Sequence, residues 1–179
     1  MAEVYKMKIA GCERELPLCA IDDKLDIAAF IMFGDVELTE KAATQLLAKC
    51  PEHDVVITAE TKGIPLCYEM ARQGCRRYLV ARKSVKTYMR NPIHVDVKSI
   101  TTDHMQKLFL AEDDYRGLSG KRVLIVDDVI STGESLAAIE NLVKQFDGNI
   151  VGRAAVLAEG DAAKRDDIIF LEPLPLFFK

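Results

Sequence analysis

Short runs of consecutive apolar residues alternate along this chain with segments in which apolar residues recur every three or four positions. Uninterrupted apolar runs are typical of strands buried on both faces of a sheet, and the longer spacing is typical of amphipathic helices. The runs predict strands at residues 55–58, 78–81, 123–126, 151–158 and 168–171. The spacing predicts helices over residues 39–50, 64–73 and 134–146. This alternation predicts an α/β fold, with a mostly parallel, doubly wound sheet of about five core strands flanked by helices.

Two residues mark candidate helix ends. Thr39 is a candidate N-cap of the first helix, because a threonine side chain can accept a hydrogen bond from a free backbone N–H of the first turn. Gly148 lies where a glycine C-cap of the last helix is expected.

Two segments lie outside the regular alternation. Residues 1–35 have a mixed pattern that ends in an apolar stretch at 27–33. Residues 84–118 are long and polar, with alternating apolar positions at 93, 95 and 97 and a further stretch at 107–110, which predicts a hairpin that projects from the sheet. No linker, repeat or low-complexity tract interrupts the chain, so residues 1–179 are predicted to form a single domain. With 179 residues, 49% of them hydrophobic, the chain can bury one sizeable core.

Composition narrows the classes of protein that need to be considered. A formal net charge of −4 gives no reason to expect nucleic-acid binding. No apolar run is long enough to cross a membrane, and the N-terminus lacks the apolar core of a signal peptide, so a cytoplasmic protein without membrane contact is expected. The five cysteines contain no C-x-x-C pair and are interpreted as reduced thiols rather than as a metal site or a disulfide framework.

The segment VLIVDDVISTGES, residues 123–135, combines a strand, a polar turn and a helix start. Asp127 and Asp128 follow the apolar run, at the strand end where ligands bind in open α/β sheets. The loop that follows supplies hydroxyl groups and Gly133, and a loop of this kind before a helix presents backbone N–H groups to a phosphate. These features suit a phosphorylated sugar. The alternative is structural: the aspartates cap a turn, and Ser131 or Thr132 caps the helix.

Two further predicted strands also run into polar turns. After the strand at 55–58, Lys62 offers a charge and Gly63 offers backbone freedom. After the strand at 78–81, Arg82, Lys83 and Lys86 offer three cations to an anionic ligand. Taken alone, either segment is more typical of an ordinary solvated turn. The argument for a site depends on all three segments occurring together.

Residues 123–135 resemble the phosphoribosyl pyrophosphate (PRPP) signature of the type I phosphoribosyltransferase family. That family transfers ribose 5-phosphate from PRPP to a nitrogenous base and releases pyrophosphate. The final position of the signature is usually threonine, and Ser135 keeps the hydroxyl. The turns after the strands at 55–58 and 78–81 extend the resemblance, because in the family they hold the pyrophosphate. The overall layout is similar to the adenine and xanthine (purine) group, which implies a small N-terminal hood at residues 1–35 and a flexible lid at 84–118.

The resemblance implies roles for individual residues. Asp127, Asp128 and Lys86 are the implied catalytic residues. The implied PRPP-binding set is Glu60, Thr61, Lys62, Gly63, Arg82, Lys83, Lys86, Asp127, Asp128, Ile130, Ser131, Thr132, Gly133, Glu134 and Ser135. The implied base-binding residues are Val129, Leu157 and Glu159.

The implied chemistry requires little from the protein beyond positioning and charge. Cleavage of the bond between the anomeric carbon and pyrophosphate leaves an oxocarbenium-like sugar, so the protein stabilises the leaving group and holds the base on the opposite face. A lid would exclude water during this step. The resemblance also implies Mg²⁺ as cofactor, with no direct protein ligand because the oxygens of PRPP hold it. The implied partners are PRPP, a purine base and a second copy of the chain in a homodimer.

The identity of the base stays open. The tail LPLFF at 174–178 and the loop STGES are similar to those of adenine enzymes, but Thr101 stands where their lids usually carry a glutamate, as in xanthine-type lids. Adenine, giving AMP in purine salvage, is favoured over xanthine or hypoxanthine and guanine. A different class is a regulator that senses PRPP without catalysis. Such regulators usually add a DNA-binding domain, for which this chain has no spare length before the core.

Overall fold

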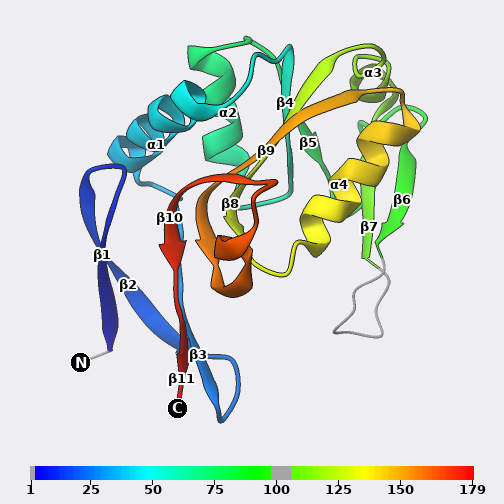
Figure 1. The fold of residues 1–179 in the computed structure, drawn as a ribbon. Coiled ribbons are helices and arrows are strands. Elements are labelled where there is room, and N and C mark those ends of the chain that lie inside the picture. Colours follow the sequence, from blue (N-terminus) through cyan, green and yellow to red (C-terminus); the bar gives the residue numbers. More distant parts are fainter. Residues whose placement is uncertain (1–2, 98–105) are drawn as a thin grey trace.

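The computed structural model describes residues 3–97 and 106–179. Its centre is a sheet of five parallel strands in the order β10-β9-β8-β4-β5 (Figure 1). The strands are β4 (Val55–Ala59), β5 (Tyr78–Ala81), β8 (Arg122–Ile130), β9 (Asn149–Glu159) and β10 (Ile169–Leu174). Each one coincides with a predicted apolar run, so the predicted α/β fold and its mostly parallel sheet are confirmed.

Helices cover both faces of the sheet. Leu124 packs in a buried cluster with residues of α1 (Val36–Lys49) and α2 (Ile64–Gln73), whereas Ile125 packs in a second cluster with α4 (Glu134–Gln145). Successive strand residues point to opposite faces, and burial of both explains why these strands lack an alternating polar pattern. Figure 1 shows α1 and α2 on one side of the sheet and α4 on the other. Within the described residues, no helix is both long and apolar enough to span a membrane.

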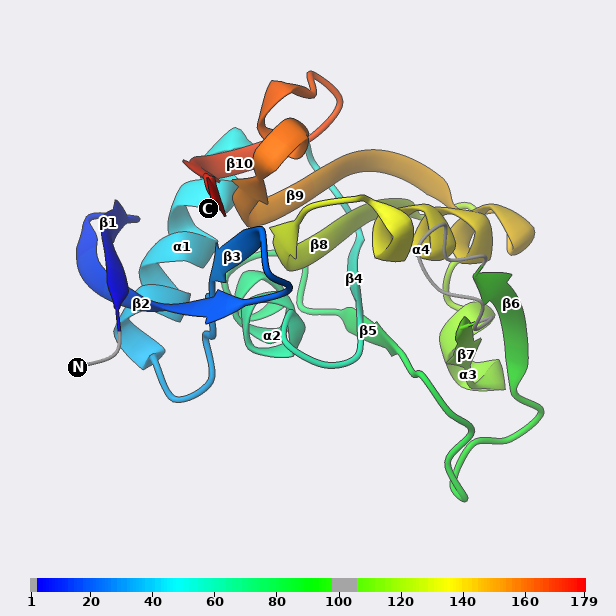
Figure 2. The same cartoon turned by 90° about the horizontal axis from the view of Figure 1, so that it is seen from below.

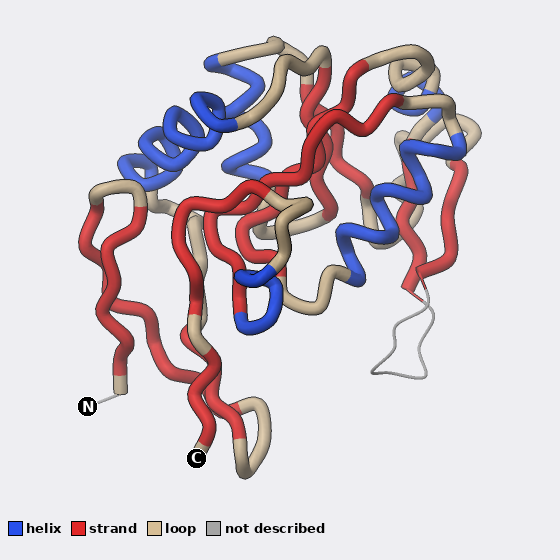
Figure 3. Tube along the Cα trace, viewed as in Figure 1, coloured by secondary structure: helices blue, strands red, loops and turns tan. Residues whose placement is uncertain are grey.

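A second, antiparallel sheet joins the two ends of the chain. Its order is β1-β2-β3-β11, and its strands are β1 (Val4–Ile9), β2 (Cys12–Ala20), β3 (Leu25–Ala28) and β11 (Leu176–Phe178). The strands near both termini lie side by side in Figure 3, and the same small sheet stands apart from α4 in Figure 2. The aromatic rings of Tyr5 and Phe177 meet edge to face with centroids 5.0 Å apart. The apolar C-terminal tail therefore completes the sheet that the N-terminal segment begins.

The predicted hairpin in the segment 84–118 is confirmed, with β6 (Ile93–Val97) antiparallel to β7 (Gln106–Leu110). It does not project freely from the molecule, because Leu108 and Leu110 are buried in the same cluster as α4. Arg82 and Phe109 exchange backbone hydrogen bonds of 2.9 and 2.8 Å, which attach β7 to the end of β5. Two short helices complete the fold, α3 (Glu112–Tyr115) and the 3₁₀ turn η1 (Gly160–Lys164). Thr101 lies outside the described residues.

Two predicted helix ends are wrong. The N-cap of α1 is Asp35, whose side chain accepts from the backbone N–H of Leu38 at 3.2 Å, and the hydroxyl of Thr39 instead donates to the carbonyl of Asp35 at 2.7 Å. An aspartate three residues before a buried apolar residue competes better for the cap than a threonine inside the first turn. At the end of α4 the left-handed residue is Asp147, with φ 58°, and Gly148 only follows it.

Candidate functional site

The loop 131–135, which comprises the turn after β8 and the first two residues of α4, borders a small cavity at the start of the helix. The cavity has a volume of about 130 Å³ and is lined by Asp127 and residues 129–136. Gly133 is the N-cap of α4, with φ 81°, and has no side chain to bond the first N–H groups of the helix. The backbone N–H of Glu134 donates to the hydroxyl of Thr132 at 3.5 Å. The first turn of a helix presents backbone N–H groups that can bind an anion.

The two aspartates lie inside β8 and not after it, which corrects the predicted strand end. Asp127 pairs with Ala155, and Val129 pairs with Leu157, both in β9. This continued pairing buries the side chain of Asp128, which is 3% exposed. The strand therefore presents two adjacent carboxylates at the carboxyl edge of the sheet, immediately before the loop that faces the cavity.

Lys62, from the loop after β4, neutralises part of this charge. Its Nζ lies 3.0 Å from the buried Oδ2 of Asp128, at ion-pair distance but out of line for a hydrogen bond. Asp127 accepts from the backbone N–H of Asp128 at 2.9 Å. Burial, followed by the charge of Asp128, raises the pKa of Asp127 to about 8, although Lys62 acts in the opposite direction. The pair therefore keeps a proton at neutral pH in the absence of a ligand.

The raised pKa of Asp127 predicts a pH dependence for the ligand-free protein. The unfolded chain releases this proton near the ordinary pKa of 3.8, whereas the folded chain keeps it to about pH 8. Asp127 therefore makes the free energy of unfolding fall as pH rises between these values. Asp127→Asn should gain stability relative to the parent by up to about 1.4 kcal/mol per pH unit in this range. Chemical denaturation of both proteins at several pH values measures this difference, and a difference that is independent of pH contradicts the assignment.

The carboxylate of Glu60 contacts the backbone of Lys83 and lies beside two of the three cations that follow β5. Its carboxylate accepts from the backbone N–H of Lys83 at 2.9 Å, and it lies 3.6 Å from Nη2 of Arg82 and 3.8 Å from Nζ of Lys86. The hydrogen bond from Lys83 is the largest cause of a lowered Glu60 pKa, and the charges of Arg82 and Lys86 act in the same direction. Lys86 also donates to the hydroxyl of Ser84 at 2.8 Å. Neighbouring parallel strands thus bring both predicted polar turns into one charged cluster.

Gly63 allows the loop after β4 to approach β8. A Cβ at this position would contact Oγ1 of Thr58 and would lie 3.0 Å from Oδ1 and 3.3 Å from Cα of Asp127. Its φ of −73° is open to any residue, so space rather than backbone freedom requires glycine here. The peptide bond between Glu60 and Thr61 is cis, and the side chain of Thr61 is exposed.

The three residues predicted to bind a base differ in their exposure. Val129 is partly buried beside the cluster that contains Ile9 and Leu16 of the antiparallel sheet, and Leu157 in the same cluster is fully buried. Glu159 ends β9 beside Leu174 and is partly exposed. Ile130, predicted to contact PRPP, is buried in the cluster on the other face of the sheet and lines the loop cavity. Of the three residues predicted to bind a base, Val129 and Glu159 therefore have surface that a ligand could reach.

Arg165 is a charged residue near the loop that sequence reasoning missed. It follows η1, and its Nη1 lies 2.8 Å from the position that a Cβ on Gly133 would occupy. No local pattern in the sequence connects a residue after β9 to the loop after β8. Only the parallel pairing of β8 with β9 brings their carboxyl ends together.

Residues 32–174 match the phosphoribosyl transferase domain family, which is most of the chain and includes all of the polar segments described above. The chain belongs to the phosphoribosyltransferase family. Among curated proteins, this phosphoribosyltransferase chain is 31% identical over 126 residues to the adenine phosphoribosyltransferase of Rhodococcus jostii, covering 70% of this chain and 69% of that protein. It is 30% identical over 173 residues to a probable purine biosynthesis transcriptional regulator, PurR, of Streptococcus pneumoniae, covering 93% of this chain but 58% of that protein.

Solved structures of adenine phosphoribosyltransferases share the fold of this phosphoribosyltransferase chain. The enzyme from Rhodothermus marinus superimposes with a TM-score of 0.65 at 19% identity, covering 94% of this chain and 92% of that one. The Saccharomyces cerevisiae enzyme, solved in complex with an imino-altritol bisphosphate and adenine, gives a TM-score of 0.62 at 18% identity with the same coverage. At this identity, the likeness establishes the fold alone.

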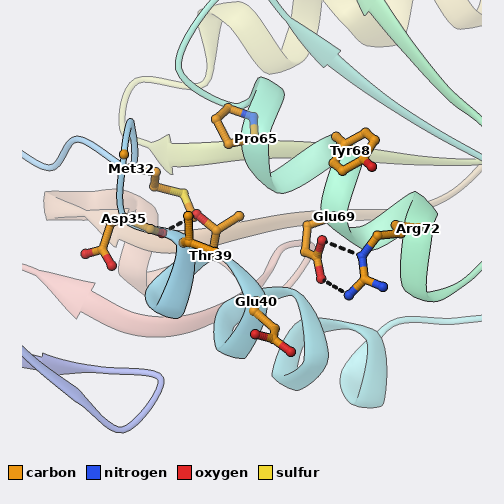
Figure 4. Close-up of a pocket in the computed structure, with 10 residues that line it drawn as sticks. Met32, Asp35, Thr39, Glu40, Pro65, Tyr68, Glu69 and Arg72 are labelled. Carbon is orange, nitrogen blue, oxygen red and sulfur yellow. Dashed lines mark hydrogen bonds and ion pairs between the residues drawn. The ribbon is translucent and has the colours of Figure 1, made fainter.

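A separate cavity of about 400 Å³ lies between α1 and α2 of this phosphoribosyltransferase chain (Figure 4). Met32, Pro65 and Tyr68 supply apolar surface around it, and the carboxylate of Glu69 is held by Arg72 with hydrogen bonds of 2.8 and 2.7 Å. None of the residues predicted to bind PRPP or the base lines this cavity. It is therefore distinct from the candidate site.

Proposed function

We propose that this chain binds PRPP and transfers its ribose 5-phosphate to a purine base, with release of pyrophosphate. The observation that carries the proposal is the grouping of three kinds of subsite at one edge of the sheet. The loop 131–135 offers N–H groups to a phosphate, the carboxylates of β8 offer acceptors to hydroxyls, and the cluster around Glu60 offers cations. PRPP presents a phosphate, a pair of ribose hydroxyls and a pyrophosphate, which match these subsites.

Each group of residues would have its own role in binding PRPP and in the transfer. Asp127 and Asp128 accept hydrogen bonds from the ribose hydroxyls and fix the sugar, which requires Lys62 to exchange its present partner for the pyrophosphate. Arg82, Lys83 and Lys86 neutralise the leaving group, because the negative charge on it increases as the bond breaks. Holding the base on the opposite face of the sugar then makes the transfer effectively unimolecular.

The residues present fit Mg²⁺ that is bound mainly by PRPP. Throughout the part of the chain that the structure describes, no three His, Cys, Asp or Glu side chains group closely enough to hold a metal on their own. Mg²⁺ usually keeps substrate oxygens and several waters as ligands, and Asp127 or Asp128 would contact the ion only through the sugar or through water. When bound, the ion neutralises charge on the pyrophosphate.

Lys86→Ala is expected to lower kcat by about tenfold or more while raising the KM for PRPP less. The reason is that charge on the pyrophosphate is largest in the transition state, so the loss of a cation costs more there than in the ground state. Steady-state rates over a range of PRPP concentrations measure the two parameters. Lys107→Ala, which removes a lysine paired with Asp96 on the hairpin, is the control and should change neither. An increase in KM with kcat unchanged would assign Lys86 to ground-state binding only.

Adenine is the proposed base. Glu159 offers carboxyl oxygens as acceptors at the carboxyl end of β9, and adenine carries an amino donor where a 6-oxopurine carries an oxygen acceptor. The curated relatives include adenine enzymes and also a hypoxanthine/guanine phosphoribosyltransferase of Methanotorris igneus at 31% identity over 132 residues. Comparison of kcat/KM for adenine, hypoxanthine, guanine and xanthine tests the choice, and a preference for an oxopurine rejects it.

A homodimer is also proposed. Val36 and Tyr68, on the rim of the cavity between α1 and α2, are 75% and 51% exposed, and the nearby Ile31 and Phe33 are 58% and 51% exposed. Exposed apolar surface of this kind is typical of a protein interface. Sedimentation equilibrium of the chain, with Val36→Lys as the comparison, tests the proposal. A parent chain that stays monomeric rejects it.

A second candidate function is the PRPP-sensing module of a regulator. The match to the Streptococcus pneumoniae regulator extends over 93% of the chain, whereas the match to the Rhodococcus jostii enzyme covers 70%. The chain spans 58% of the length of that regulator. A module of this kind would bind PRPP with the same residues and would release no pyrophosphate.

Release of pyrophosphate from PRPP in the presence of Mg²⁺ and a panel of purines separates the two functions. Release that depends on a base supports the transferase. Binding of PRPP in a calorimeter without base-dependent release supports the sensing module and rejects catalysis. The absence of both binding and release rejects the PRPP site itself.

A further inference from the structure

The loop that is proposed to hold the 5-phosphate has no cation of its own. Residues 127–135 contain two aspartates and one glutamate but no lysine or arginine. A phosphate in this loop would be bound by backbone N–H groups and hydroxyls, so a positive charge at the phosphate site has to come from another part of the fold.

Arg165 brings a guanidinium to this loop. Its Nη1 lies 2.8 Å from the position of a Cβ on Gly133, the N-cap of α4. In Figure 1 the orange turn of η1, which precedes Arg165, lies beside the yellow loop that leads into α4. The side chain is 34% exposed, so it is accessible to a ligand in solution.

Asp167 fixes the orientation of this guanidinium. Nε of Arg165 donates to Oδ1 of Asp167 at 2.8 Å, and Nη2 donates to Oδ2 at 2.7 Å. These two bonds use one edge of the guanidinium, and Nη1 is left on the side of Gly133. The contact with Asp167 is the largest cause of a raised Arg165 pKa and of a lowered Asp167 pKa, so both groups are charged at neutral pH. A planar guanidinium held in this way is preorganised to donate to a phosphate.

We propose that Arg165 binds the 5-phosphate of the phosphorylated sugar through Nη1, which closes the loop 131–135 from the side of η1. The proposal rests on the proposed function, because it concerns the same site. It adds a charged contact from outside the PRPP signature, supplied by the segment after β9. Asp167 acts as a positioning residue, since it holds Arg165 through two hydrogen bonds.

Binding of ribose 5-phosphate and of pyrophosphate to Arg165→Gln, measured by calorimetry, tests the proposal. A hydrogen bond to a charged group contributes about 1.5–3 kcal/mol, so the affinity for ribose 5-phosphate should fall about tenfold to hundredfold. The affinity for pyrophosphate should not change, because that anion is proposed to bind at the cluster around Glu60. Arg165→Lys, which keeps the charge without the planar fork, should lose less affinity.

Lys164→Gln is the matched control. It removes one positive charge from the adjacent residue, whose side chain is 79% exposed and pairs with Asp161. If this variant keeps its affinity while Arg165→Gln loses affinity for ribose 5-phosphate alone, a direct contact is supported. Equal losses in both variants, or no loss in Arg165→Gln, overturn the proposal and leave the pair with Asp167 as a local turn contact. A parent chain that binds neither ribose 5-phosphate nor PRPP rejects the proposed function instead. Melting temperatures without ligand show whether each variant is folded.

Discussion

Replacement of both Asp127 and Asp128 by asparagine is expected to weaken PRPP binding by about a hundredfold or more while leaving the fold intact. Carboxyl oxygens accept hydrogen bonds from hydroxyls, and a hydrogen bond to a charged group contributes about 1.5–3 kcal/mol. Loss of two such acceptors therefore accounts for at least that factor. Asparagine keeps the shape of the side chain and removes the unfavourable burial of two adjacent acidic groups, which raises the pKa of Asp127, so the ligand-free variant should melt no lower than the parent. Calorimetry with PRPP and Mg²⁺ measures the affinity.

Asp113 and Asp114 provide a matched control, because they are a second pair of adjacent aspartates. They belong to α3, which precedes β8 and lies at the amino end of the sheet, away from the loop that follows this strand (Figure 1). Their double asparagine variant should bind PRPP like the parent. Unchanged affinity in the Asp127→Asn, Asp128→Asn variant would remove the two aspartates from the site.

Gly133→Val is expected to eliminate the stabilisation of the protein by ribose 5-phosphate and PRPP. The backbone at Gly133 has φ 81°, a left-handed conformation that costs an L-residue about 1–2 kcal/mol and a β-branched residue more. A side chain there would also displace Arg165, whose Nη1 lies 2.8 Å from the added Cβ. Both effects would move the N–H groups that the loop offers to phosphate. The shift in melting temperature on adding each ligand is the measurement.

Gly120→Val is the control that separates the backbone strain caused by Gly133→Val from its effect on the phosphate loop. Gly120 also has a positive φ, 68°, but nothing lies within 4 Å of a Cβ at that position, and it precedes β8 at the opposite end of the strand from the loop. Both variants should lose comparable stability without ligand, whereas only Gly133→Val should lose the ligand-induced shift. If ligands raise the melting temperature of Gly133→Val as much as that of the parent, the loop does not bind the phosphate.

The sequence predicted the central sheet well, because a strand that is buried on both faces appears in the sequence as an uninterrupted run of apolar residues. The runs at 55–58, 78–81 and 123–126 have no polar member on either face except Thr58 and Tyr78, and each became a strand of the sheet. The antiparallel sheet was harder to predict. It combines β1, β2 and β3 with β11, which comes from the other end of the chain, and pairing across such a distance has no local signature.

The helix boundaries were predicted less well, because several residues near each end could form the cap. Asp35 and Thr39 are both good capping residues by type, and the choice of Asp35 depended on which residue reaches the free N–H of Leu38. Arg14, from the β1–β2 hairpin, also donates to the two carboxylate oxygens of Asp35 at 2.6 and 2.9 Å. This contact holds the capping aspartate in place, and no pattern around residue 35 predicts it.

The sequence by itself determined which side chains lie near the carboxyl end of each core strand, and therefore that carboxylates, a glycine loop and cations would meet at one edge of a parallel sheet. It could do so because strand direction alone decides which strand ends share an edge. Only the tertiary structure decided how those groups pair: Lys62 with Asp128, Glu60 with the cations after β5, and Arg165 with the loop at Gly133. These contacts depend on distances between segments that are separated in the chain. Their strengths, and the raised pKa of Asp127, depend on burial, which the complete fold creates.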